Sequence, residues 1–201
     1  MTDSLEKRPR GRPVTTDPAA VGLTALKLFY ELGIDRVTMD DVAIQAGISR
    51  SNLFRVFPSK SAVVWGGMQR ITEELKRQLA SSPETSAVKL LHQSWVGAMH
   101  VLDDSLETVR LRLKLIASSP EVYGWGHAQL EEARKVLEAA IARFEDPNSV
   151  RPKMLSSALI AVSMSVLTWW AETDDPRSVA EVLDESFSDF EAIFASVRQG
   201  E

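Results

Sequence analysis

The chain has 201 residues, of which 44% are hydrophobic and 25% charged, within the ordinary range of globular proteins. It contains no cysteine, which excludes disulfides, thiolate catalysis and cysteine-ligated zinc or iron–sulfur clusters. The net charge of −5 is unevenly spread, because residues 1–60 hold nine Lys/Arg against seven Asp/Glu and residues 61–201 hold 14 against 21. A basic excess at the start of an acidic chain leaves nucleic-acid binding open at that end.

Two segments bear on location. The first twenty residues lack the apolar run of a secretory signal, so we expect a cytoplasmic protein. Residues 154–171 carry no charge and just approach the length of a membrane span. Their five hydroxyl side chains and marginal length favour a helix buried against other helices, so we expect no membrane partner.

Apolar residues recur at helical spacing from the start of the chain. The first stripe ends at Gly33 and consists of Val21, Ala25, Leu28, Phe29 and Leu32. Thr38, with Asp41 three residues later, predicts the capped start of a short helix that ends at Gly47. Ser49 caps a second short helix, and Pro58 marks the break before the next one.

Later breaks are predicted where Ser, Asp and Pro cluster, at residues 81–83, 118–120, 146–148 and 174–176. Helical stretches of roughly 17 to 35 residues lie between these breaks, and the longest ones contain an internal break. No segment alternates with period two before a hairpin turn, so no sheet is expected. The sequence predicts an all-α fold of about nine helices, with a small basic N-terminal unit and a larger acidic helical body.

The two short helices around Gly47 have the lengths of a helix-turn-helix motif. In the second helix, Leu53 and Phe54 can face inward. The residues left on its outward face are Arg50, Ser51, Asn52 and Arg55, which can hydrogen-bond base edges or phosphates. The alternative is an ordinary solvated helix face.

A basic run at residues 7–13 precedes the motif. It holds four cations together with glycine and prolines, which disfavour helix and favour an extended arm. Arginines on both sides of Gly11 suit a narrow minor groove, and residues 9–13 look like the core of an AT-hook. Taken alone such a run is more often a solvated tail, but beside a helix-turn-helix a DNA-binding arm is favoured.

The spacing of residues 19–66 matches a known signature. The matching positions are Ala20, Leu28, Phe29, Gly33, Thr38, Met39, Asp40, Asp41, Val42, Ala43, Ala46, Gly47, Ile48, Ser49, Leu53, Phe54, Phe57, Pro58, Ser59 and Lys60. This pattern resembles the TetR family of transcriptional regulators. The resemblance implies a homodimer with a flexible basic arm at residues 1–18, a DNA-binding head of three helices with the helix-turn-helix at 19–60, and a ligand-binding and dimerisation domain at 61–201.

The resemblance also implies which residues contact DNA. Thr38 and Lys60 would hold phosphates, and residues 49–55 would form the recognition helix. The DNA-binding residues expected are Arg8, Arg10, Arg12, Thr38, Ser49, Arg50, Ser51, Asn52, Phe54, Arg55 and Lys60. The family usually has Tyr at the position of Phe54, and often Tyr or His at that of Val56. A phosphate-directed hydroxyl is therefore missing here, and affinity relies more on the basic residues.

Aromatic and methionine side chains in the expected body suit an apolar ligand cavity. The candidates are Trp65, Met68, Trp95, Met99, Leu111, Leu115, Tyr123 and Trp125. For each of them alone, ordinary core packing is the alternative.

Residues 53–66 further resemble the mycofactocin-system branch of the family, whose regulators respond to long-chain acyl-CoA. Such an effector needs cations at the cavity mouth, and Arg110 and Lys114 share one helical face with Arg112 nearby. The alternative is that these cations balance the acidic residues Asp103, Asp104 and Glu107 on the surface.

The C-terminal segment carries an apolar stripe that, with residues 154–171, exceeds what one core readily buries. A four-helix interface between two copies is the simplest explanation. The dimerisation residues expected are Leu159, Val162, Val166, Leu183, Phe187, Phe190 and Phe194.

No constellation for catalysis is visible. His92 and His100 lie near one helical face without a third ligand at suitable spacing, so no metal, catalytic residue or cofactor is expected. The sequence predicts a regulator that an apolar small molecule releases from a palindromic double-stranded operator, more in keeping with a repressor than an activator. The alternatives are a helical carrier or enzyme with a vestigial helix-turn-helix, and an architectural DNA binder without a ligand.

Overall fold

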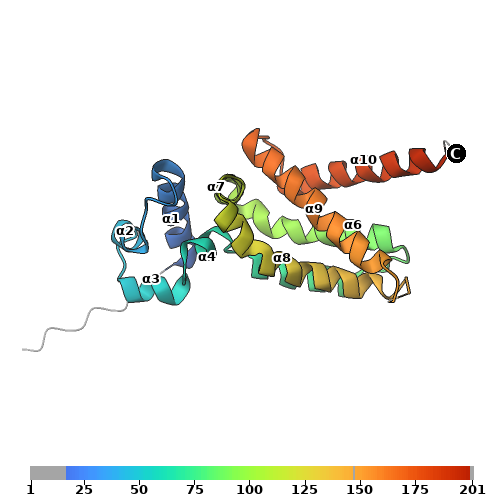
Figure 1. Ribbon diagram of the computed structural model, residues 1–201, viewed down its shortest axis with the longest axis horizontal. Coiled ribbons are helices and arrows are strands. Elements are labelled where there is room, and N and C mark those ends of the chain that lie inside the picture. Colours follow the sequence, from blue (N-terminus) through green and yellow to red (C-terminus); the bar gives the residue numbers. More distant parts are fainter. Residues whose placement is uncertain (1–16, 147, 200–201) are drawn as a thin grey trace, which may run out of the picture.

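The computed structural model describes residues 17–146 and 148–199, without the side chains of residues 103, 104 and 190–199, and every regular element in these ranges is a helix. A small head contains α1 (Pro18–Leu32), α2 (Met39–Gln45), α3 (Arg50–Val56) and α4 (Lys60–Val64). The body contains α5 (Met68–Ser81), α6 (Ala87–Met99), the 3-10 helix η1 (His100–Ser105), α7 (Leu106–Ser118), α8 (Pro120–Ile141), α9 (Arg151–Glu172) and α10 (Val179–Gln199). Figure 1 shows the head at one end of an elongated body. The predicted all-α fold is confirmed.

The described ranges contain ten α-helices, whereas the sequence predicted about nine. The additional boundary lies between α4 and α5, where Trp65 ends one helix and Gly67 precedes the next. Gly67 has a φ of 104°, a backbone conformation that glycine adopts without steric cost. The internal break expected in the long stretch before residue 118 is the 3-10 helix η1.

The helix caps around the turn follow the sequence closely. The Thr38 hydroxyl accepts a hydrogen bond from the backbone N–H of Asp41, and the Asp41 carboxylate accepts one from the backbone N–H of Thr38, which completes a capping box. The Ser49 hydroxyl caps α3 by accepting from the N–H of Asn52. These two caps, with Gly47 at φ 65° between them, fix the direction of α3 relative to α2.

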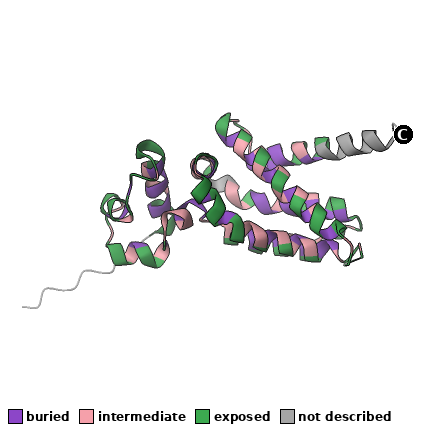
Figure 2. Cartoon of the chain, viewed as in Figure 1, coloured by how far each residue is buried: buried purple, intermediate pink, exposed green. Residues whose placement is uncertain are grey.

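Two apolar clusters form the core. The body cluster joins all the α-helices from α5 to α10 around the fully buried Trp170. The head cluster includes Phe29 and Leu53 but extends beyond the head, because it also contains Ile116 of α7 and Val122 of α8. Figure 2 shows buried residues running through the junction of the two parts. The head is therefore packed onto α7 and α8 and does not hang from a linker.

Helix α9 is the one helix in the described ranges that is long and apolar enough to cross a membrane by length and composition. A core helix passes the same test, and α9 packs against α7, α8 and α10. One side of α9 is buried against these helices, as expected. The other side is exposed.

Candidate DNA-binding face and ligand cavity

The recognition helix α3 presents a polar face to solvent. Arg50, Ser51 and Arg55 are exposed and Asn52 is partly buried, while Leu53 is fully buried beneath them in the head cluster. The amphipathic pattern of α3 therefore separates its packing side from a side free to meet DNA. Nothing in the described residues covers this outward face.

The sequence predicts that Phe54 can face inward, but in the structure it is 37% exposed. The guanidinium of Arg50 lies 5.3 Å from the centre of its ring. The same guanidinium donates to the Asp40 carboxylate at 3.0 Å. In the free protein, Arg50 is thus held between an aromatic ring and a carboxylate.

Two expected phosphate contacts have structural roles. The Thr38 hydroxyl donates to the Asp41 carboxylate at 2.7 Å within the capping box. These hydrogen bonds from Thr38 hold the pKa of the Asp41 carboxyl below its usual value. The ammonium of Lys60 donates to the carbonyl oxygen of Ile34 at 2.7 Å and so ties the start of α4 to the loop after α1. Arg8, Arg10 and Arg12 lie outside the described residues.

A cavity that is partly open to solvent lies in the body between α5, α6, α7 and α9. Four of the eight ligand-binding candidates line it: Trp65, Met68, Trp95 and Met99. The wall is almost wholly apolar, and it also contains Leu113, Leu130, Ile160 and Met164, which are not among the eight candidates.

The other four candidates lie elsewhere, which corrects the expectation. Leu115 is buried in the head cluster and Leu111 packs against it. Tyr123 and Trp125 are 49% and 40% exposed on the first turns of α8. Helical spacing identified apolar positions, but it did not indicate which side of α7 and α8 faces the cavity.

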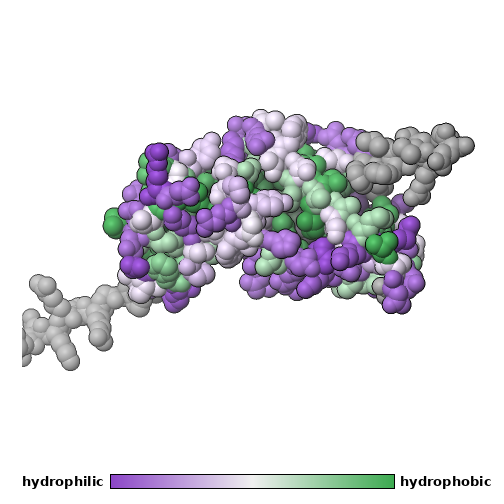
Figure 3. All heavy atoms as spheres, in the orientation of Figure 1, coloured by the Kyte–Doolittle hydropathy of each residue, from purple (hydrophilic) through white to green (hydrophobic). Residues whose placement is uncertain are grey.

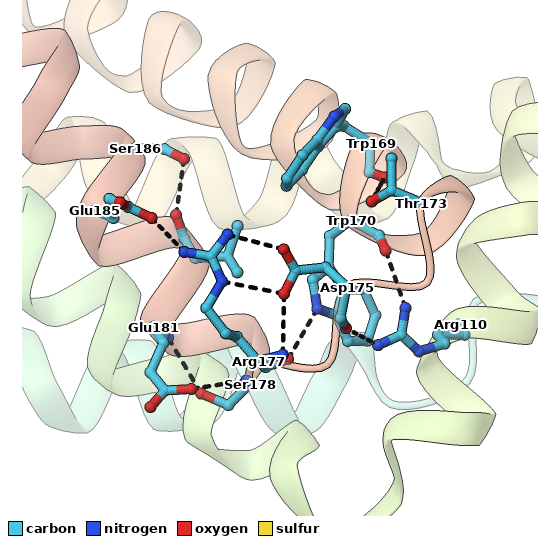
Figure 4. A network of polar contacts seen from close by, with 11 residues as sticks. Arg110, Trp169, Trp170, Thr173, Asp175, Arg177, Ser178, Glu181, Glu185 and Ser186 are labelled. Carbon is cyan, nitrogen blue, oxygen red and sulfur yellow. Dashed lines mark hydrogen bonds and ion pairs between the residues drawn. The ribbon is translucent and has the colours of Figure 1, made fainter.

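The expected cationic pair is already occupied by protein acceptors. Arg110 donates to the carbonyl oxygens of Trp170, at 2.9 Å, and Asp175, and its guanidinium stacks on the Trp170 ring (Figure 4). Lys114 donates to the Asp174 carboxylate at 2.8 Å. Both cations therefore fasten α7 to the loop between α9 and α10, and neither lines the cavity. The alternative, in which these cations balance Glu107, is not seen either, since Glu107 forms an ion pair with Lys27.

Arg112, between these two cations on α7, is the residue that lines the cavity. Its Nε is shut off from solvent and has no hydrogen-bond partner among the described residues. Burial, together with the positive charge of Arg70, lowers the pKa of Arg112 to about 10. The three cations look alike in sequence, so only the rotation of α7 distinguishes the buried one.

Comparison with known families identifies both parts of the chain. Residues 23–64 match the model for bacterial regulatory proteins of the tetR family, and residues 85–195 match the MftR C-terminal domain. The second match alone covers more than half of the chain. The chain belongs to the TetR family. It is a transcriptional regulator with an MftR-type C-terminal domain.

Individual relatives agree with this assignment. The chain is 27% identical over 181 residues to a protein of Mycobacterium tuberculosis named as the mycofactocin biosynthesis transcriptional regulator MftR, covering 88% of this chain and 90% of that protein. Among solved structures, the fatty acid degradation regulator FadR of Bacillus halodurans has a TM-score of 0.65 at 13% identity, covering 90% and 95% of the two chains. The SmeT–triclosan complex, whose protein comes from Stenotrophomonas maltophilia, has a TM-score of 0.61 at 19% identity and covers 86% and 90%.

Several expected dimerisation residues of this TetR-family chain are buried within the single subunit. Leu183 is fully buried and Phe187 is 4% exposed, with its ring against His92. Leu159 also belongs to the body cluster, while Val162 and Val166 pack at its edge. Burial at Leu183 and Phe187 corrects the expectation that these side chains meet a partner. The side chains of Phe190 and Phe194 lie outside the described residues.

Helix α9, in contrast, has apolar side chains exposed to solvent. Met154 and Trp169 are 51% and 48% exposed, and Ala161 is exposed between them. In the view of Figure 3, apolar residues gather where α9 crosses the body. An exposed apolar stripe on a helix of this length is typical of a surface that another protein copy covers.

The described residues contain no group of three or more His, Asp or Glu side chains that could hold a metal ion. His92 hydrogen-bonds to the Asp184 carboxylate at 2.9 Å, which fastens α6 to α10. His92 therefore has a structural role.

Proposed function

We propose that this regulator is a homodimeric repressor that leaves a palindromic double-stranded DNA operator when an apolar small molecule enters the body cavity. Residues 1–18 would act as the basic arm, 19–60 as the DNA-binding domain and 61–201 as the ligand-binding and dimerisation domain. The protein would work in the cytoplasm, where the operator is, and would catalyse no reaction.

The position of Trp65 carries this proposal. The residue ends α4, lines the cavity and belongs to the head cluster at the same time. A molecule in the cavity would touch the same indole that packs under the DNA-binding head. Binding would thereby favour one arrangement of the heads over another, which is the thermodynamic requirement for release.

The exposed face of α3 supports DNA as the partner. Its arginine, serine and asparagine side chains match the donors and acceptors that read base edges in a major groove. Two such helices must lie about 34–36 Å apart to enter successive grooves, which a two-fold dimer provides. The exposed stripe on α9 supplies a surface for that dimer.

The apolar wall of the cavity supports an apolar effector. The SmeT relative was solved with triclosan, a compact apolar molecule. A long-chain acyl-CoA is the second candidate, which the resemblance to the mycofactocin-system branch favours. Its phosphates would need cations other than Arg110 and Lys114, because protein acceptors already hold both of these.

A selection for bound duplexes from a random DNA pool tests the proposal. We expect a palindrome with two half-sites about one helical turn apart. Ser51→Ala and Asn52→Ala should each cost roughly 1–3 kcal/mol at one base pair per half-site. Lys60→Met should weaken all duplexes alike, because it loosens the head without touching a base.

The alternatives give different results in the same experiment. Enrichment of no sequence, with binding retained, would favour an architectural DNA binder. Failure to bind DNA at low salt would favour a carrier or enzyme with a vestigial head. A sequence preference altered by Lys60→Met but not by the α3 variants would refute the assignment of α3 as the reading helix.

A further inference from the structure

The unsatisfied polar atoms of the cavity wall are both donors. Among the lining residues, the indole N–H of Trp65 is paired with Val122 and the hydroxyl of Ser163 donates to Leu159 at 2.6 Å. In contrast, Trp95 Nε1 and Arg112 Nε are buried without any hydrogen-bond partner in the described residues. Both nitrogens are closed off from solvent, so each is a buried donor beside the cavity for which the described residues supply no acceptor.

Arg112 differs from every neighbouring cation on its helix. Arg110 and Lys114 each have protein acceptors, whereas the buried Nε of Arg112 has none in the described residues. The nearest charge that acts on it is positive, on Arg70. Burying a guanidinium without a counter-ion is costly, so such an arrangement is expected where an anion completes it.

Two glycines leave room for this guanidinium. A methyl carbon at Gly66 would lie 3.1 Å from Arg112 Nη2, and one at Gly67 would lie 3.3 Å from Nη1. A second, more polar pocket shares Arg112 with the cavity and also contains Arg70, Ser105 and Thr108. Arg112 therefore stands at the boundary between the apolar cavity and a positively charged pocket.

We propose that the effector is an apolar carboxylate, whose acidic group binds Arg112 at this boundary while its apolar part contacts the Trp and Met side chains of the cavity. This inference rests on the proposed function for the cavity and specifies the chemical class of its ligand. A carboxylate supplies acceptors to the guanidinium in the planar geometry that arginine prefers. A neutral apolar molecule would leave the buried cation unpaired, and an amine would be repelled by Arg112 and Arg70.

Calorimetric titration of the full-length protein, without DNA, tests the head group directly. The probes share one chain and differ at its end: dodecanoic acid, methyl dodecanoate, dodecylamine and dodecanoyl-CoA. We expect the acid to bind about tenfold or more tightly than the ester, because a hydrogen bond to a charged group is strong when desolvated. The amine should show no measurable binding.

Variants then assign the preference to one residue. Arg112→Met should bring the acid and the ester to equal affinity, whereas Arg112→Lys should keep part of the preference. Lys89→Met is the matched control, since it removes an exposed cation from α6 that lies outside the cavity. Melting curves confirm that each variant folds, and Arg112→Gln replaces Arg112→Met if the latter does not.

Equal affinity of acid and ester for the unaltered protein would overturn the inference, and so would binding of none of the probes. Tight binding of dodecanoyl-CoA that survives Arg112→Met would overturn it in favour of an acyl-CoA. Release from the selected duplex is measured separately. Release by the ester alone would refute the carboxylate proposal but leave the proposed function intact. Binding of the acid that depends on Arg112 but causes no release would support the carboxylate proposal and refute the proposed function.

Discussion

The indole N–H of Trp65 donates a 2.7 Å hydrogen bond to the carbonyl oxygen of Val122, which joins the end of α4 to the first turn of α8. Trp65 is 5% exposed and Val122 is 3% exposed, so the bond is shielded from water. Loss of a buried bond of this kind costs about 1–3 kcal/mol, because one partner stays unsatisfied. The contact thus sets the position of α4, and with it the head, relative to the body.

Gly126 is required where the Trp65 ring crosses α8. A methyl carbon there would lie 2.0 Å from two atoms of the indole, whereas one at Gly124 on the same helix would meet nothing within 4 Å. We expect Gly126→Ala to lower the free energy of unfolding by about 1–3 kcal/mol through overpacking. Gly124→Ala should be neutral or stabilise by up to about 1 kcal/mol, since alanine favours helix. Thermal unfolding of both variants measures the difference.

Equal melting temperatures for the two glycine variants would contradict the position assigned to Trp65. A displaced indole should also change the response of the operator complex to an effector. Fluorescence anisotropy of a labelled selected duplex, with and without effector, would detect this change. Gly124→Ala should respond as the unaltered protein does.

The local signals in the head were predictable from the sequence because they depend on neighbours along the chain. The capping box at Thr38 and Asp41 and the N-cap at Ser49 are set by residues three positions apart, and the structure contains both. The family match also rests on this segment. The prediction that Phe54 can face inward is wrong, because a seven-residue helix gives too few positions to determine which apolar residue is buried.

The cavity could be predicted only in part, since it depends on the rotation of packed helices. Trp95 and Met99 were identified by type, whereas Arg112 was not distinguished from the two cations on either side of it. Which cation of α7 is paired with a protein acceptor depends on where Trp170 and Asp175 lie, about sixty residues later in the chain. Similarly, the described part of the apolar stripe of α10, up to Phe187, belongs to the body cluster and packs against α6 and α9.

The dimer interface is expected on the exposed face of α9. Trp169→Glu should place a charge in that interface and give folded monomers with an unchanged helical spectrum. Phe187→Glu should instead bury a charge against α6 and unfold the body, because Phe187 is packed inside one subunit. Sedimentation and circular dichroism distinguish the two outcomes. If the Trp169→Glu protein remains a dimer, the interface must lie on another surface.

The pairing of Arg50 with Asp40 is expected to oppose DNA binding. Both side chains are more than half exposed, so the ion pair itself contributes little stability. Asp40→Asn should remove a negative charge from the DNA-facing surface and free Arg50, which raises affinity for the selected duplex and steepens its dependence on salt. Fluorescence anisotropy at several salt concentrations measures both. Weaker binding of Asp40→Asn would show that the carboxylate positions Arg50 for DNA.

The loop between α9 and α10 is expected to make folding sensitive to acid. Hydrogen bonds from Arg177 lower the pKa of Asp175 to about 2, below the value of about 3.9 for an unfolded chain. Because the folded-state pKa is the lower one, this stabilisation is present above about pH 4 and is lost as the pH falls toward about 2. Arg177→Gln should therefore lower the melting temperature at pH 7, and its difference from the unaltered protein should shrink toward pH 2. A difference that does not change with pH would exclude this carboxylate as its source.

The basic arm is expected to add affinity through charge. Deleting residues 1–13 removes Lys7, Arg8, Arg10 and Arg12 but leaves Asp17, which caps α1 by accepting from the N–H of Ala19, in place. The head should fold as before, so any change reflects lost contacts with DNA. Each lost phosphate contact should reduce the slope of log affinity against log salt by about one unit. Replacing the four cations by glutamine in the full-length chain provides the matched control, since it keeps the length of the arm. An unchanged slope in both proteins would show that the arm does not reach the DNA.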